Sequence, residues 1–135
     1  MRFIDTNLLL RYFTRDDEEK AQKVLALLKR VEKAEEKVTI SSLVIFETVF
    51  TLESFYKVPK KEIKELILPI LNLRGLKLPD KETYHQALDI YANKNISLTD
   101  AFNTAFCLRK GIKEIYSYDE DFDKIEGIKR ITPVS

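Results

Sequence analysis

Four acidic residues lie at positions from which their carboxylates could act together: Asp5, Glu47, Asp100 and Asp119. If they converge in the fold, each pair at about 4 Å costs on the order of 1 kcal/mol in water and about 4 kcal/mol at an effective dielectric constant of 20. A divalent cation relieves this repulsion, and ligands that are all oxygens suit Mg²⁺ or Mn²⁺ rather than zinc. One or two such ions orient and deprotonate a water for in-line attack on a phosphodiester. The residue types therefore indicate metal-dependent phosphate chemistry that needs no side-chain nucleophile.

Glu47 is the most informative of the four because its helical neighbours carry no positive charge. Three and four residues away lie Leu43, Val44, Phe50 and Thr51. A carboxylate in such a stretch must face a partner or a metal ion, or become neutral. By contrast, Glu53 in the same predicted helix has Lys57 four residues on and is typical of a solvated carboxylate. The alternative for Glu47 is a narrow solvent-facing stripe that it shares with the nearby threonines.

The other three acids each have an ordinary structural explanation. Asp5 fits a turn or cap, where Asp and Asn are common. Ser97 and Asp100 fit a capping box, and the helix macrodipole favours an acid at that position. Asp119 belongs to an acidic run that is typical of a solvated turn. A functional interpretation depends on the combination, since all four can meet at one edge of one sheet.

The elements that must position these acids alternate between strands and helices. With three glycines and four prolines in the chain, we expect long elements and short loops. The patterns predict strands near residues 2–5, 37–40, 75–78, 113–117 and 129–132, and helices near residues 7–13, 16–34, 41–56, 60–73, 80–94 and 97–110. Strands separated by helices predict crossovers and a mostly parallel sheet. We expect the first and fourth strands to lie side by side at its centre, with the polar residues at their carboxyl ends.

Length and composition limit the class of protein. The 135 residues predict one domain over residues 1–135, and 23 positive against 22 negative charges exclude a strongly basic nucleic-acid coat. A single cysteine, Cys107, and a single histidine, His85, exclude a disulfide framework and a zinc site of several cysteines. No apolar run reaches about 18 residues, and the N-terminus has no signal-peptide pattern. We therefore expect a soluble, cytoplasmic protein with no membrane partner.

The ordered set of motifs resembles the PIN domain family, and in particular its VapC-type toxin ribonucleases. The motifs that carry the resemblance are residues 3–12 (FIDTNLLLRY), Glu47, residues 98–101 (LTDA) and residues 117–123 (SYDEDFD). The resemblance covers essentially the whole chain. It implies a three-layer α/β/α fold with a central, mostly parallel sheet of about five strands. It also implies an endoribonuclease that depends on Mg²⁺ or Mn²⁺.

The family's acidic residues carry over onto Asp5, Glu47, Asp100 and Asp119, which would be both catalytic residues and metal ligands. Because the last motif holds more than one acid, Asp121 could share or take the fourth position. Four polar residues are expected to orient these ligands through hydrogen bonds: Thr6, Asn7, Asn103 and Ser117. Arg11 matches a frequent arginine of the family and is expected to contact RNA phosphate. The resemblance further implies a homodimer and a small antitoxin protein that covers the acidic groove.

Two other functions fit parts of the sequence. In a Mg²⁺-dependent phosphatase or phosphotransfer domain, Asp5 itself would be the nucleophile. That class expects a second aspartate two residues on, where this chain has Asn7. A PIN-like module that binds RNA or protein without cleaving is the non-enzymatic alternative. The intact acidic set argues against it, since a non-catalytic copy would be free to lose those charges.

Overall fold

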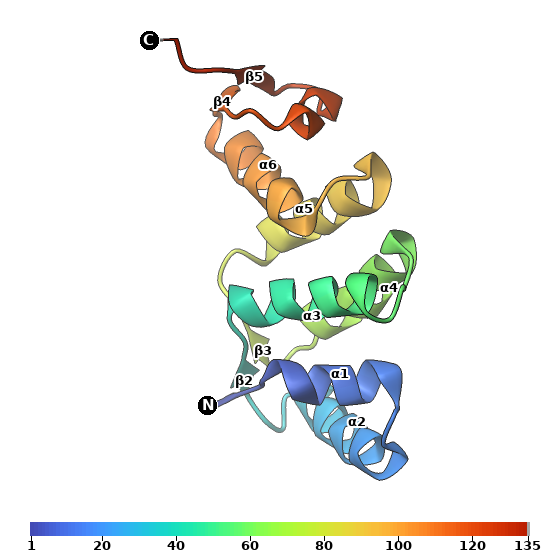
Figure 1. Cartoon of the computed structure of the whole chain (residues 1–135). Helices are drawn as coiled ribbons and strands as arrows, with labels where there is room; N and C mark the ends of the chain where they lie inside the picture. The colour runs from blue at the N-terminus through green and yellow to red at the C-terminus, as the bar shows by residue number, and fades with distance from the viewer. Residues whose placement is uncertain (135) are drawn as a thin grey trace. The chain divides into compact units, whose positions relative to one another are not determined.

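The computed structural model of the chain describes residues 1–134 and divides into two compact units, Met1–Pro79 and Asp80–Ser135 (Figure 1). Each unit has its own helices, its own parallel strands and its own buried apolar residues. In the described part of the chain, every helix is too short or too polar to cross a lipid bilayer. One domain over the whole length stays a prediction.

The first unit consists of three parallel strands joined by pairs of helices. The strands are β1 (Arg2–Phe3), β2 (Val38–Thr39) and β3 (Leu76–Lys77), hydrogen bonded in the order β1-β2-β3. The helices are α1 (Thr6–Thr14) and α2 (Glu18–Glu32) between the first two strands, and α3 (Ser42–Ser54) and α4 (Lys60–Leu71) before the third. Helical connections between parallel strands are what the alternating pattern predicts. The crossovers in this unit are therefore confirmed.

Side-chain caps set where two helices of the first unit begin. The carboxylate of Asp17 accepts from the backbone N–H of Lys20 at 3.1 Å, and the hydroxyl of Ser41 accepts from that of Val44 at 3.3 Å. Each cap satisfies one of the backbone donors that a helix start leaves unpaired. Asp17 is thus the N-cap of α2, and the helix begins at Glu18 within the range that the sequence predicts, near residues 16–34.

The second unit is a helical hairpin followed by a short parallel pair of strands. Its elements are α5 (Lys81–Lys94), α6 (Leu98–Lys110), β4 (Glu114–Tyr116), the 3₁₀ helix η1 (Glu120–Lys124) and β5 (Lys129–Ile131). The two helices carry fully buried alanines, Ala87 on α5 with Ala101 and Ala105 on α6. Small side chains let helix backbones approach closely, which fixes α6 against α5. The C-terminus of α6 ends on Gly111, whose φ of 73° is the left-handed conformation that glycine adopts without strain.

All five predicted strands are present, but in the described residues they form two hydrogen-bonded sheets rather than one. β1 pairs with β2, β2 with β3, and β4 with β5, all in parallel. Each strand is only two or three residues long and therefore offers few ladder hydrogen bonds. Each of these pairings joins strands of the same unit. The expected position of β1 beside β4 stays a prediction.

Candidate active site

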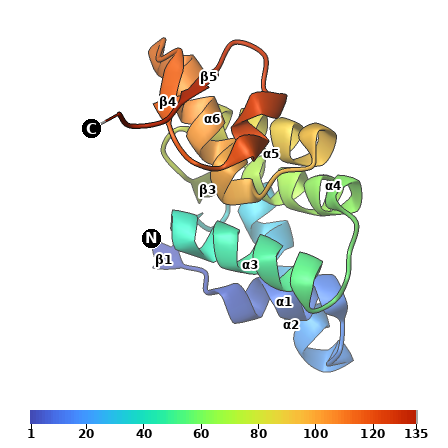
Figure 2. The ribbon, with the colours of Figure 1, turned by 45° about the horizontal axis from the view of Figure 1, so that its top comes forward.

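Three of the predicted acids come together in the second unit. Carboxylate oxygens of Asp100, Asp119 and Asp121 all lie within 4.8 Å of one another, and we call these residues the acidic cluster. Asp100 lies in the first turn of α6, while Asp119 and Asp121 lie at the start of η1, which follows β4. Figure 2 shows η1 beside α6. The turn after β4, which holds Asp119 and Asp121, therefore lies at the beginning of α6, where Asp100 is.

Asp100 lies in a capped helix start and also belongs to the acidic cluster. Ser97 is the N-cap of α6, and its hydroxyl accepts from the backbone N–H of Asp100 at 3.1 Å. This hydrogen bond uses the backbone N–H of Asp100, and the carboxylate of the same residue belongs to the acidic cluster. The predicted cap is thus confirmed, and it does not compete with a functional role for the same residue.

The turn that carries Asp119 and Asp121 is ordered by its own short-range hydrogen bonds. The backbone N–H of Asp119 donates to the hydroxyl of Ser117 at 3.0 Å, and that of Asp121 donates to the carboxylate of Asp119 at 2.9 Å. Phe122 is buried and anchors the turn in the unit. Ser117 therefore holds the backbone at Asp119, which is the kind of orienting contact expected of it. Asn103, one turn after Asp100, is exposed on α6.

Arg130 fixes this turn from the neighbouring strand, and the sequence analysis missed it. Its guanidinium pairs with both carboxylate oxygens of Asp123, at 3.1 and 3.2 Å, and its Nη1 donates to the backbone carbonyl of Ser117 at 3.2 Å. A two-point arginine–carboxylate contact constrains geometry more than a single bond does. The contact joins β5 to both ends of the turn that holds Asp119 and Asp121. No local spacing reveals it, because Asp123 and Arg130 are seven residues apart and on different elements.

Two cations, Lys124 and Arg130, lie near the acidic cluster, and Asp100 nevertheless disfavours its own ionisation. Lys124 pairs with Asp121 at 3.0 Å and also donates to the carbonyl of Asn95 at 3.2 Å. Burial raises the pKa of Asp100, and the charge of Asp119 and hydrogen bonding with it raise that pKa further; hydrogen bonding with Ser97 acts in the opposite direction. Carboxylates that disfavour their own ionisation in this way gain from a bound cation.

The donor set of the cluster fits a hard divalent ion. Mg²⁺ and Mn²⁺ prefer carboxylate oxygens, and three such groups converge here. Bonds of about 2.1 Å allow two ligand oxygens to be at most about 4.2 Å apart. The observed limit of 4.8 Å is close to this value, so small side-chain movements suffice. Asp100, Asp119 and Asp121 are the residues that could hold such an ion in the second unit.

Asp5 lies in the first unit, at the N-cap of α1. Its side chain is exposed and makes no capping hydrogen bond, although an N-cap aspartate ordinarily accepts one. Thr6 is buried and Asn7 is exposed, and neither donates to the carboxylate of Asp5 in the described chain. The oxygens of Asp5 are therefore available to a ligand, and the orienting roles of Thr6 and Asn7 stay predictions.

Glu47 lies on the exposed side of α3, also in the first unit. Its neighbours on this side, Leu43 and Phe50, are 77% and 69% exposed. Water therefore reaches the carboxylate, and burial does not demand a partner for it. The solvent-facing stripe exists, but it contains large apolar residues rather than Thr48, which is fully buried. Glu53 pairs with Lys60 at 3.4 Å instead of the expected Lys57.

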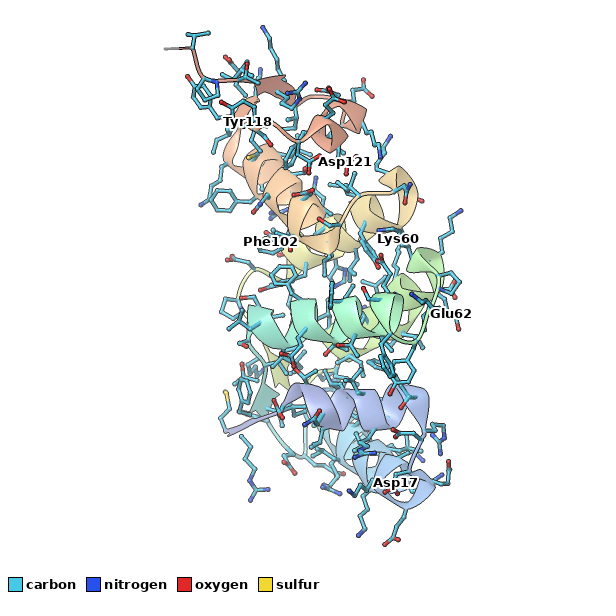
Figure 3. All side chains as sticks on the ribbon, viewed as in Figure 1. Asp17, Lys60, Glu62, Phe102, Tyr118 and Asp121 are labelled. Carbon is cyan, nitrogen blue, oxygen red and sulfur yellow. The ribbon has the colours of Figure 1, made fainter. Side chains whose placement is uncertain are left out.

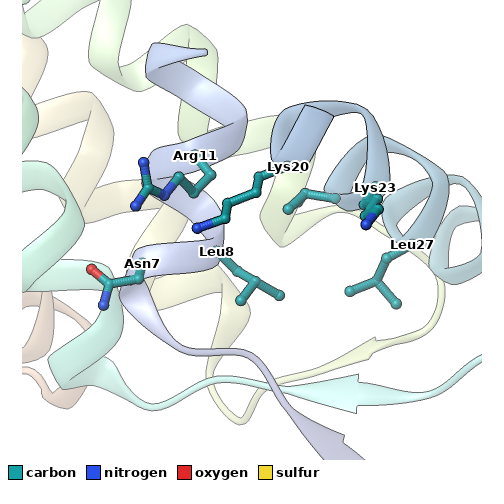
Figure 4. A pocket seen from close by; sticks show the side chains of 7 residues that line it. Asn7, Leu8, Arg11, Lys20, Lys23 and Leu27 are labelled. Atoms are coloured by element: carbon teal, nitrogen blue, oxygen red, sulfur yellow. The ribbon is translucent and has the colours of Figure 1, made fainter. Parts of the chain in front are cut away.

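Arg11 lines a cavity of about 560 Å³ between α1 and α2 (Figure 4). The other lining residues are Asn7, Leu8, Lys20, Lys23, Val24 and Leu27. Figure 4 shows the side chain of Lys20 extending from α2 toward α1, the helix that carries Arg11. The cavity thus combines an apolar floor with three cations and no acid. Each cation also has an ion pair on the surface, with Asp16 at 3.2 Å in the case of Arg11.

Comparison with known proteins identifies relatives of the whole chain. The profile of the PIN domain matches residues 2–128. A VapC ribonuclease from Aquifex aeolicus (strain VF5) is 28% identical over 133 residues, which are 98% of this chain and 97% of that protein. The PIN domain is a three-layer α/β/α fold, so the match confirms the fold class predicted from the sequence.

Proposed function

Because the chain belongs to the PIN domain family, we propose that it is a Mg²⁺- or Mn²⁺-dependent endoribonuclease that hydrolyses RNA phosphodiesters. The observation that carries this proposal is the approach of the Asp100, Asp119 and Asp121 oxygens to within 4.8 Å of one another. The similarity to a protein named VapC ribonuclease supports RNA as the substrate.

In this proposal the residues of the chain bind and orient, and none of them forms a covalent intermediate. Asp100, Asp119 and Asp121 hold the metal, and Asp5 and Glu47 complete the ligand set. Ser97 and Ser117 fix the backbone at two of the ligands, and Thr6, Asn7 and Asn103 are proposed to assist by hydrogen bonds. A bound divalent ion supplies an activated water and neutralises charge on the phosphodiester.

The cavity between α1 and α2 suggests how partners are recognised. Arg11 is proposed to contact RNA phosphate, with Lys20 and Lys23 adding positive charge nearby. We also propose that a small antitoxin protein covers the acidic groove. A toxin–antitoxin pair, a homodimer and a cytoplasmic location complete the proposal.

A cleavage assay with and without metal tests the function. The protein is incubated with a panel of structured and single-stranded RNAs in Mg²⁺, Mn²⁺ or EDTA. We expect cleavage with metal, none with EDTA, and a loss of about a thousandfold for Asp100→Asn, which corresponds to several kcal/mol of transition-state stabilisation. Glu120→Gln is the matched control and should retain activity, because Glu120 lies in the turn that holds Asp119 and Asp121 but is outside the acidic cluster.

Two results would contradict the proposal. Metal-independent cleavage, or equal activity of the Asp100→Asn and Glu120→Gln variants, would remove the role of the acidic cluster. Release of phosphate from a phosphomonoester, with a trapped aspartyl-phosphate at Asp5, would favour the phosphatase alternative instead.

A further inference from the structure

A second cavity, of about 270 Å³, lies between the start of α5 and the second half of α6. Its lining residues are Asp80, Thr83, Phe102, Phe106, Arg109 and Lys110, all in the second unit. None of them belongs to the acidic cluster or to the motifs that identify the family. We call this the α5–α6 pocket.

The pocket presents aromatic rings to solvent. Phe106 is 47% exposed, and the Nζ of Lys110 lies 5.8 Å from the centroid of its ring. Phe102 packs against Tyr84 with ring centroids 4.9 Å apart and is half-buried. Phe106 thus offers an exposed ring on which a nucleobase can stack, and Phe102, which packs on Tyr84, lines the same pocket.

Two cations flank these rings. Arg109 and Lys110 are exposed, and neither forms an ion pair with a residue of the described chain. Their place in the last turn of α6 is favourable for the helix macrodipole. The dipole does not explain why an exposed phenylalanine lies beside them. A nucleotide ligand explains the combination, because it offers a flat base and a negatively charged phosphate within the same small molecule.

Asp80 supplies the one acceptor side chain with a negative charge in the pocket. It is the N-cap of α5, but its backbone is left-handed, with φ of 60°, and its carboxylate makes no capping hydrogen bond. A carboxylate beside a stacked base accepts well from an exocyclic amino group, such as N4 of cytosine. Its presence therefore favours a nucleotide over a simple anion, which a carboxylate would repel.

We propose that the α5–α6 pocket binds one nucleotide of a single-stranded RNA segment. The base stacks on Phe106, Arg109 and Lys110 hold its phosphates, and Asp80 accepts from its exocyclic amino group. This inference rests on the proposed function in that RNA is taken as the substrate.

The nucleotide in this pocket is not the one that is cleaved. Arg109 follows Asp100 by nine residues on α6, which is about two and a half turns and about 14 Å along the helix axis. The two side chains therefore leave opposite sides of the helix. Figure 3 likewise shows Phe102 on one side of α6 and Asp121 on the other. The pocket adds affinity for RNA at a distance from the scissile bond.

Binding of RNA in EDTA tests the inference without cleavage. The probe is a fluorescein-labelled single-stranded RNA of mixed sequence, followed by anisotropy. We expect Phe106→Ala to weaken binding about tenfold, as for other base–aromatic contacts. Replacing Arg109 and Lys110 together by glutamine should lower the slope of log K against log salt by about 1.4, or about 0.7 for each phosphate contact with a single strand. Phe55→Ala and Arg74→Gln, an exposed aromatic and an exposed cation of the first unit, are matched controls and should bind as the wild type does.

Base preference and competition sharpen the test. With Asp80→Asn, a preference for oligocytidine over oligouridine of about tenfold should disappear. Free CMP should displace the RNA only at millimolar concentration, since it lacks the other contacts of a strand. Displacement by micromolar CMP would overturn the assignment to RNA and indicate a mononucleotide site. Should Phe106→Ala fail to fold, Phe106→Leu keeps the apolar volume and removes the ring.

The proposed function and this inference can fail separately. If both hold, pocket variants raise KM for RNA cleavage and leave kcat unchanged. If wild-type protein binds RNA through Phe106 but cleaves nothing in any metal, the proposed function fails and the pocket stands. If cleavage is normal and the pocket variants bind RNA as tightly and with the same salt slope as the wild type, the inference is overturned.

Discussion

The two units of the chain position their acidic residues in different ways. In the second unit, a serine cap, a 3₁₀ turn and the Arg130–Asp123 pair bring three carboxylates within 4.8 Å of one another. In the first unit, Asp5 and Glu47 are exposed on two separate helices and have no such scaffold of hydrogen bonds around them. The second unit thus accepts electrostatic repulsion to keep its acids close. In the proposed function, a bound cation offsets this repulsion.

The largest expected effect on RNA cleavage concerns the acids of the first unit. If Asp5 and Glu47 complete the ligand set, Asp5→Asn and Glu47→Gln should each lower RNA cleavage by about a thousandfold, as much as Asp100→Asn does. Single-turnover cleavage in Mn²⁺ measures this. Glu53→Gln, on α3 and paired with Lys60, is the matched control. Cleavage that survives in both variants would confine the chemistry to the second unit.

The next largest expected effect is on metal affinity and concerns Arg130 in the second unit. Arg130→Met removes the contact that joins β5 to the acidic turn, and should weaken Mn²⁺ binding by about 10- to 100-fold, the range typical of residues that orient metal ligands. Calorimetric titration of the variant with Mn²⁺ measures the affinity directly. Asp123→Asn should reproduce the loss, whereas Arg2→Met, which breaks an exposed pair with Glu36, should not. Unchanged affinity in both the Arg130→Met and the Asp123→Asn variants would show that the turn needs no support from β5.

The parts of the fold that depend on nearby residues were predictable from the sequence. The helix from Ser97 to Gly111 begins and ends where its cap residues indicate, because both signals act within one turn. All five strands were also predicted. Their division between two hydrogen-bonded sheets was not, because strand order depends on contacts between residues far apart in the chain.

The same division applies to the site. The Ser97 cap was predictable because cap chemistry is local, whereas Asp100, Ser117 and Asp119 were named as site residues through the ordered motifs and the family resemblance. For Glu47 the sequence left open a partner or metal ion and a solvent-facing stripe, because sequence neighbours on a helix do not show which side of it faces solvent; the residue is exposed, and its role as a ligand stays a prediction. Arg130 gave no signal, since its partner is seven residues away on another element. The convergence of Asp5 and Glu47 with the other acids stays a prediction, because these two residues belong to the first unit and the acidic cluster to the second.

The smallest expected effect concerns the stability of the metal-free protein. The pKa of Asp100 is raised above its ordinary value of 3.8, first by burial and then by Asp119. Below that ordinary value the group is protonated in both the folded and the unfolded chain, so it contributes nothing to pH dependence. As pH rises through the raised pKa, the folded chain must ionise Asp100 against burial and repulsion, and stability falls. The penalty is complete once the pH lies above the raised pKa.

Asp100→Asn should therefore stabilise the metal-free protein at pH 7 by about 1 kcal/mol, the size of one carboxylate pair near water, or about 3–5 °C in Tm. The Ser97 cap survives the substitution because it uses the backbone N–H. Thermal melts in EDTA should show this advantage shrinking to nothing near pH 4, while Glu120→Gln shows no such trend. In Mn²⁺ the order should reverse, since only the wild type gains from the bound ion. An advantage that is independent of pH, or a loss of stability at neutral pH, would mean that Asp100 is a structural capping residue and that the second unit holds its acids together for the fold rather than for a metal.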